Sequence, residues 1–134
     1  MTMASGILLV THAGVATALI AAARHVLVRL PDTLDSVELP ADADPELSLR
    51  EATRHAASLD QGAGVLVLSD LYGATPCNIA QRLSEHRARL RWVAGLNLPM
   101  LLRVLNYAAR PLDELAEIAV SGGHTGIRID HEPC

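Results

Sequence analysis

Short apolar runs alternate along the chain with longer stretches whose apolar residues recur at helical spacing. Five runs have the length and composition of strands, and they cover residues 6–11, 36–39, 63–69, 90–94 and 126–129. Most of their apolar residues follow one another without polar interruption. Strands of a parallel sheet show this pattern because helices bury both of its faces. The pattern therefore predicts strands of a covered parallel sheet.

Five stretches with helical spacing lie between and after these runs. They cover residues 15–28, a segment from Asp44, a segment from Thr75, and residues 98–109 and 112–120. Asp44 and Thr75 each precede a proline, which is typical of a helix start with a capping side chain and proline in the first turn. The apolar face of the second helix consists of Leu49, Ala52, Ala56 and Leu59. Gly122 and Gly123 are predicted to end the fifth helix.

The alternation of strands and helices predicts an α/β fold with a doubly wound, mainly parallel sheet and helices on both faces. Only "GGHT" separates the fifth helix from the run at 126–129, and this is too short for a covered parallel crossover. We therefore expect the last strand to lie antiparallel at an edge of the sheet, or to leave the domain and pair with another subunit. Residues 1–134 are expected to form a single domain, with a core at about 5–129.

Composition argues against a nucleic-acid partner. The chain has one Trp, two Tyr and no Phe, so it lacks the aromatic platforms on which single-stranded bases stack. Its net charge of −4 at pH 7 also disfavours binding to a phosphate backbone.

The basic residues and the cysteines narrow the chemistry further. All eleven basic side chains are Arg, and the absence of Lys excludes a Walker-type phosphate site and Schiff-base catalysis. Cys77 and Cys134 are far apart and no signal peptide is evident, so both are interpreted as reduced thiols of a cytoplasmic protein. No apolar stretch approaches the ~20 residues of a membrane span, and no direct membrane insertion is expected.

Polar clusters directly follow three of the predicted strands. His12 follows the first, "SDLYGATP" at 69–76 follows the third, and "GLNLP" at 95–99 follows the fourth. Carboxyl ends of parallel strands share one edge of a sheet, where ligands bind. If the first and third strands are neighbours, Asp70 can accept a hydrogen bond from one nitrogen of His12. The other nitrogen would then be free to attack a phosphoryl group.

The helix from Thr75 adds a candidate anion site at the same edge. Its free N–H groups and its dipole face that edge, and the turn at Gly73 precedes it. Thr75 could add a hydroxyl donor and Asn97 a side-chain amide. Both residues also have a structural interpretation, because each stands where it can cap a helix.

Three segments together carry a family resemblance. "LLVTHAG", "SDLYGATPCN" and "GLNLPMLL" resemble the landmarks of the mannose-family IIA domain of the bacterial phosphoenolpyruvate-dependent sugar phosphotransferase system (PTS), in order and spacing over roughly residues 5–129. The resemblance implies a phosphocarrier that accepts a phosphoryl group on His12 from the phosphocarrier HPr and passes it to a IIB partner in sugar uptake. Such a phosphocarrier needs no cofactor and no metal, because the donor is already an activated phosphohistidine.

The resemblance also assigns roles to the other site residues. It implies that Asp70 orients His12, and that the last strand is exchanged across a homodimer. The turn that would cradle the phosphate consists of Leu71, Tyr72, Gly73, Ala74 and Thr75. Four positions depart from the family pattern: Ala13 and Ala74 replace Gly, Thr75 replaces Ser, and Cys77 replaces Phe. Alanine is disfavoured at positive φ, so the fit of the two alanines depends on the backbone there.

Two other functions use the same residues. In the first, the chain is a stand-alone regulatory module, and the phosphorylation state of His12 controls a partner. In the second, Ser69 or Thr75 is the nucleophile of a hydrolase and His12 is its base, although no Gly-x-Ser-x-Gly motif is present. The spacing of His124, His131 and Cys134 matches no established zinc pattern, so no metal site is predicted.

Overall fold

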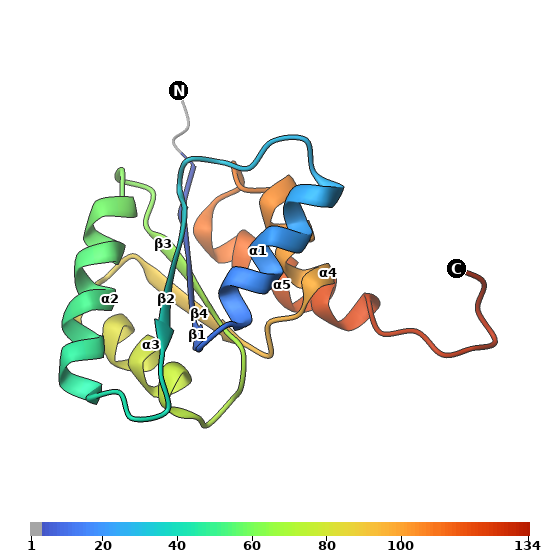
Figure 1. Ribbon diagram of the computed structural model, residues 1–134. Helices are drawn as coiled ribbons and strands as arrows, with labels where there is room; N and C mark the ends of the chain where they lie inside the picture. The colour runs from blue at the N-terminus through green and yellow to red at the C-terminus, as the bar shows by residue number, and fades with distance from the viewer. Residues whose placement is uncertain (1–3) are drawn as a thin grey trace.

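The computed structural model describes residues 4–134 and consists of one parallel sheet between two layers of helices. In chain order its elements are β1 (Gly6–His12), α1 (Val15–Val26), β2 (Leu34–Leu39), α2 (Pro45–Leu59), β3 (Val65–Ser69), α3 (Thr75–His86), β4 (Leu90–Ala94), α4 (Leu98–Asn106) and α5 (Leu112–Thr125). The strand order is β2-β1-β3-β4, and every neighbouring pair is parallel. Helices α1, α4 and α5 cover one face and α2 and α3 the other (Figure 1). The predicted α/β class is confirmed.

The two central strands explain the uninterrupted apolar runs. Leu9 and Leu68 pack under α1, α4 and α5, whereas Leu8 and Val67 pack under α2 and α3. All four side chains are fully buried. Successive residues of a strand point to opposite faces, so a strand covered on both sides needs apolar residues at every position.

The fifth helix is longer than predicted, and the prediction that Gly122 and Gly123 end it is wrong. Helix α5 continues to Thr125, and both glycines are buried within it. A Cβ at Gly122 would lie 2.7 Å from the Cβ of Arg103, and one at Gly123 would lie 3.0 Å from the Cε of Met100. Both contacts come from α4. The glycines allow α4 and α5 to approach closely, and they do not end the helix.

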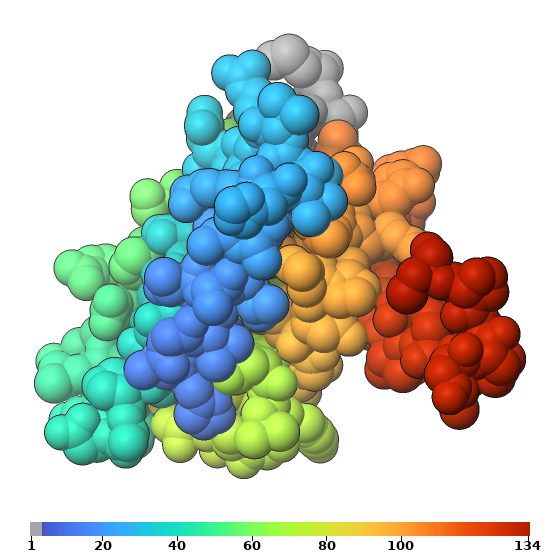
Figure 2. All heavy atoms as spheres, turned by 45° about the vertical axis from the view of Figure 1, so that its right-hand side comes forward, coloured from blue at the N-terminus to red at the C-terminus, as the bar shows by residue number. Residues whose placement is uncertain are grey.

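No fifth strand forms within residues 4–134, so an antiparallel strand at the edge of the chain's own sheet is wrong. Residues 126–129 leave α5 and stand away from the sheet, as Figure 2 shows for the C-terminal tail. Ile127 and Ile129 are 72% and 61% exposed. The N–H groups of Gly126 and Ile127 bond back to the last turn of α5, to the carbonyls of Gly122 and His124. Pairing of this segment with another subunit stays a prediction.

The other differences are shifts of element ends. β2 begins two residues earlier than predicted, at Leu34, while α1 and α4 end earlier, at Val26 and Asn106. β3 begins at Val65 because Gly64 has a φ of +91°, which is incompatible with a regular strand. Within residues 4–134, none of the helices has the length and apolar character needed to cross a membrane.

Candidate functional site

His12 and Asp70 meet at the carboxyl edge of the sheet. β1 and β3 are neighbours, which places the last residue of β1 beside the residue that follows β3. Nδ1 of His12 lies 2.9 Å from Oδ2 of Asp70. The backbone N–H of His12 donates to the same oxygen at 3.1 Å. One carboxylate oxygen therefore holds both the main chain and the ring of His12.

This geometry defines the two nitrogens of the ring. A carboxylate only accepts, so Nδ1 carries the proton in the 2.9 Å contact with Asp70. Nε2 has no hydrogen-bond partner in the described part of the chain, and in the neutral ring it carries the lone pair. The side chain of Asp70 is 11% exposed, whereas that of His12 is 45% exposed. The structure thus presents an oriented, accessible imidazole nitrogen.

Four helices begin at this edge, because α1, α2, α3 and α4 each follow a parallel strand. In three of them, side-chain oxygens accept hydrogen bonds from the N–H groups of the first turn. Asp44 accepts from the N–H of Glu46 in α2 at 2.9 Å, and Asn97 accepts from that of Met100 in α4 at 2.9 Å. In α1 the acceptors are Thr11 and Glu38.

The N-terminus of α3 is open. No side chain caps it, and Pro76 in its first turn has no N–H. The backbone N–H groups of Thr75 and Cys77 have no acceptor within residues 4–134. A helix N-terminus with free N–H groups attracts anions through these donors and through its dipole. Among the four helices that start at this edge, α3 is therefore the one whose N-terminal N–H groups are free to bind an anion.

The turn before α3 and the first residue of that helix contain the predicted cradle residues. Leu71 and Tyr72 are exposed, and the Tyr72 ring lies 6.5 Å from the Trp92 ring between centroids. Gly73 has a φ of +87°, and a Cβ there would meet no atom within 4 Å. The left-handed backbone, rather than crowding, is the reason for glycine at this position.

The alanines that replace family glycines fit their positions. Within the described residues, no residue other than glycine has a positive φ, and Ala74 has a φ of −84°. Next to each alanine, it is the adjacent glycine that has a positive φ: Gly14 beside Ala13 and Gly73 beside Ala74. Neither Ala13 nor Ala74 is therefore strained by its side chain.

Thr75 and Asn97 differ in their structural roles. The predicted cap at Thr75 is wrong, because Thr75 is the first residue of α3 and Ala74 occupies the capping position. Thr75 is exposed and lies at the helix start that carries the open N–H groups. Asn97 caps α4, and its amide also donates to the carbonyl of Gly123 at 3.2 Å. Its contact with a ligand stays a prediction.

Ser69 is fully buried, which leaves no path for a substrate to its hydroxyl and argues against its role as a hydrolase nucleophile. Within residues 4–134, no group of three His, Cys, Asp or Glu side chains is placed to bind a metal ion.

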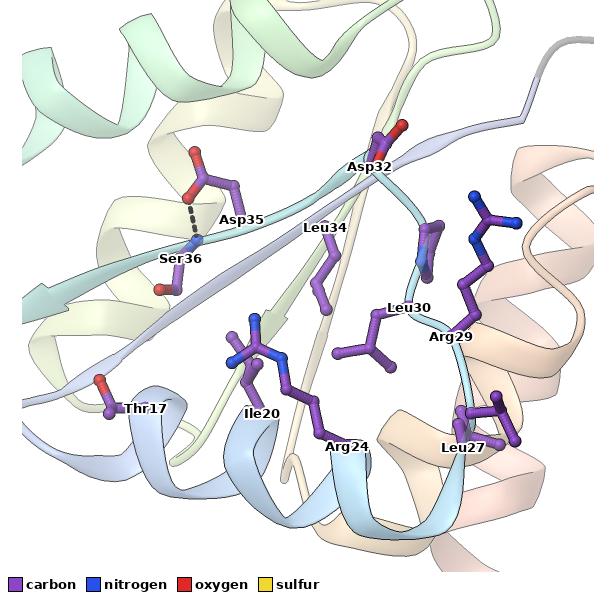
Figure 3. Close-up of a pocket in the computed structure, with 12 residues that line it drawn as sticks. Thr17, Ile20, Arg24, Leu27, Arg29, Leu30, Asp32, Leu34, Asp35 and Ser36 are labelled. Carbon is purple, nitrogen blue, oxygen red and sulfur yellow. Dashed lines mark hydrogen bonds between the residues drawn. The ribbon is translucent and has the colours of Figure 1, made fainter.

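A groove of about 710 Å³ lies apart from His12, between α1, the loop after it and β2 (Figure 3). Arg24 and Arg29 line it together with Asp32 and Asp35, so its charges are mixed. It contains neither the oriented imidazole nor the open helix end.

Thr11 and Glu38, whose side chains bind the N-terminal N–H groups of α1, were not identified from the sequence. Oγ1 of Thr11 accepts from the N–H of Ala16, and Glu38 accepts from those of Gly14 and Thr17. The available signal was the polar residue Glu38 near the carboxyl end of β2, at the same edge as His12.

Comparison with known proteins agrees with this geometry. The family model described as "PTS system fructose IIA component" matches residues 6–120. The mannose-specific EIIAB component of the PTS of Escherichia coli K12 is 29% identical over 130 residues, covering 94% of this chain and 39% of that protein. The chain thus spans about two fifths of the length of this relative.

Solved structures show the same fold. The mannose/sorbose specific IIA subunit of Enterococcus faecalis superposes with a TM-score of 0.79 at 29% identity, over 98% of both chains. The EIIA component of Streptococcus agalactiae superposes with a TM-score of 0.83 at 21% identity, over 92% of this chain and 95% of that one. Because the family model covers most of the sequence, the chain belongs to the EIIA-man family of PTS IIA components.

Proposed function

We propose that this protein is a phosphocarrier of a sugar PTS. In this function, His12 accepts a phosphoryl group from phospho-HPr and passes it to a IIB component. The observation that carries the proposal is the 2.9 Å contact between Nδ1 of His12 and Asp70, which leaves Nε2 accessible beside the open N-terminus of α3. Membership of the EIIA-man family supports the same chemistry.

The step exchanges one P–N bond for another. The lone pair of Nε2 of His12 attacks the phosphorus of the donor phosphohistidine. The P–N bond of the donor breaks, and its electron pair returns to the donor imidazole. As phosphorylation draws electrons from the ring, the carboxylate of Asp70 stabilises the proton on Nδ1. Transfer to the acceptor repeats the exchange in the opposite sense.

The turn before α3 is the proposed cradle for the phosphoryl oxygens. The cradle comprises Leu71, Tyr72, Gly73 and Ala74 of this turn together with Thr75, the first residue of α3. The open N–H of Thr75 can donate to one oxygen, and its exposed hydroxyl can donate to another. The N–H of Cys77, also open, belongs to the same first turn of the helix. These donors supply positive potential without any lysine.

We also propose a homodimer in which residues 126–129 pair with β4 of a second copy. At the other edge of the sheet, the N–H of Ser36 in β2 already donates to Asp35 at 2.8 Å, which disfavours strand pairing there. The register of β4 on β3 leaves the N–H of Trp92 pointing away from the sheet. A groove of about 530 Å³ runs beside it, and Val120 of α5 lines this groove.

Deletion of residues 126–134 tests the dimer. We expect the full chain to sediment as a dimer and the shortened chain as a monomer. Equal sedimentation of the two proteins would contradict strand exchange.

Mass spectrometry after incubation with phosphoenolpyruvate, enzyme I and HPr tests the phosphocarrier. The wild-type protein should gain one acid-labile phosphoryl group, and His12→Ala should gain none. His55→Ala is the matched control, because Nδ1 of His55 also lies against a carboxylate, Asp35, at 2.6 Å. Labelling of His12→Ala at the wild-type level would refute the assignment. Labelling that no IIB protein can remove would favour the regulatory module.

A further inference from the structure

A carboxylate closes the N-terminus of α1. Oε1 of Glu38 accepts from the N–H of Gly14 at 3.0 Å, and Oε2 accepts from that of Thr17 at 2.7 Å. The register partner of Glu38 in β1 is Thr11, whose Oγ1 accepts from the N–H of Ala16 at 3.1 Å. Figure 3 shows Thr17 on the first turn of α1, facing β2. Two adjacent strands therefore satisfy the first turn of this helix.

The N-termini of α1 and α3 are alternatives for an anion beside His12. Gly14, the residue before α1, follows His12 by two residues, and α3 begins five residues after Asp70. Both ends would attract a phosphoryl group through their N–H groups and dipoles. One is filled by a negative charge, and the other is open.

Glu38 is held in its charged form by the same contacts. The backbone N–H groups of Thr17 and Gly14 lower the pKa of its carboxyl from the usual value, because they bind the ionised form. Near neutral pH the carboxylate both occupies the donors of α1 and repels a second anion.

We propose that Glu38 is a positioning residue that closes α1 to anions and thereby directs the phosphoryl group on His12 to α3. This inference rests on the proposed phosphocarrier function for its consequence, but the closure itself can be measured without phosphotransfer. A role in helix capping alone predicts only a loss of stability when Glu38 is replaced. Closure to anions predicts in addition a new anion site at Gly14 and Thr17.

Two substitutions separate charge from shape. Glu38→Gln keeps the size of the side chain, but its amide has one acceptor oxygen, so one of the two N–H groups loses its partner. Glu38→Ala frees both N–H groups. Asp44→Ala is the matched control, because it opens the N-terminus of α2 at the same edge without touching α1.

Titration of the ¹⁵N-labelled proteins with inorganic phosphate tests the closure. In the wild-type protein, we expect the amide signals of Gly14 and Thr17 to stay unchanged. In Glu38→Ala, and more weakly in Glu38→Gln, these signals should move with phosphate, and in Asp44→Ala they should not. Movement of these signals in the wild-type protein, or their constancy in both Glu38 variants, would overturn the proposal.

Inhibition of His12 labelling by inorganic phosphate tests the consequence. Phosphate bound at α1 would compete with the productive position at α3, so labelling of Glu38→Ala should be about tenfold more sensitive to phosphate than that of the wild type. Equal sensitivity of the two proteins would refute the directing role. A wild-type protein that is not labelled at all would refute the phosphocarrier function, whereas the amide titration would still decide whether Glu38 closes α1.

Discussion

Replacement of Asp70 by asparagine tests how the orientation of His12 produces its reactivity. In the wild-type protein, Oδ2 of Asp70 accepts from the ring at 2.9 Å and from the backbone N–H of His12 at 3.1 Å. An asparagine has one uncharged acceptor oxygen, and its amide can place either that oxygen or the NH₂ group at the position of Oδ2. If its amide nitrogen faces the ring, Nδ1 must become the acceptor. The proton then moves to Nε2 and blocks the nucleophile.

The expected size of the effect follows from the hydrogen bond that is lost. A hydrogen bond to a charged group contributes about 1.5–3 kcal/mol. Its loss in the transition state would slow phosphoryl transfer by roughly 13- to 160-fold, since about 1.36 kcal/mol corresponds to a factor of ten. The side chain of Asp70 is only 11% exposed, so water cannot readily replace the contact.

Rapid-quench measurement of His12 labelling by phospho-HPr gives this rate directly. Asp35→Asn is the matched control, because it makes the same substitution in the pair between His55 and Asp35, on α2 and β2. We expect Asp70→Asn to slow labelling while Asp35→Asn leaves the rate unchanged. Labelling of folded Asp70→Asn at the wild-type rate would refute the role of Asp70.

Three further predictions concern the stability of the fold. Gly73→Ala should lower the free energy of unfolding by about 1–2 kcal/mol, because alanine is strained at a φ of +87° although the space is free; urea denaturation that shows no loss would contradict this. Asn97→Ala should lower it by about 1 kcal/mol through the lost cap of α4, and an unchanged urea midpoint would argue against the cap. The backbone N–H of Gly62 and the Arg87 guanidinium are among the groups that lower the pKa of Asp60. The Asp60 carboxylate therefore stabilises the fold at a pH above its usual pKa of 3.8, and this contribution is lost as the pH falls through the lowered pKa. Asp60→Asn should therefore be less stable than the wild type at pH 7, with a difference that shrinks in acid; a difference independent of pH would refute this assignment.

The sequence was most informative where local pattern and tertiary environment coincide. The uninterrupted apolar runs of β1 and β3 arise from burial on both faces, so they predicted a covered parallel sheet. The contact between His12 and Asp70 followed from the same pattern, given that the two strands are neighbours. That β1 and β3 are neighbours in the sheet was assumed for that prediction and was not itself predicted from the sequence.

The features that the sequence did not reveal depend on contacts between distant segments. Gly122 and Gly123 have the local signature of a helix end, but the approach of Arg103 and Met100 from α4 explains them. Glu38 stands in a short strand with no motif around it, and its role exists only because β2 lies beside β1 and α1.

The position of the phosphoryl group on the ring of His12 tests the central claim most directly. Two-dimensional ¹H–¹⁵N spectra of the phosphorylated, ¹⁵N-histidine-labelled protein distinguish the two nitrogens. The contact between Nδ1 and Asp70 predicts phosphorylation on Nε2 of His12, with the proton retained on Nδ1. Phosphorylation on Nδ1, or on another residue in a protein whose His12 stays unmodified, would contradict the account.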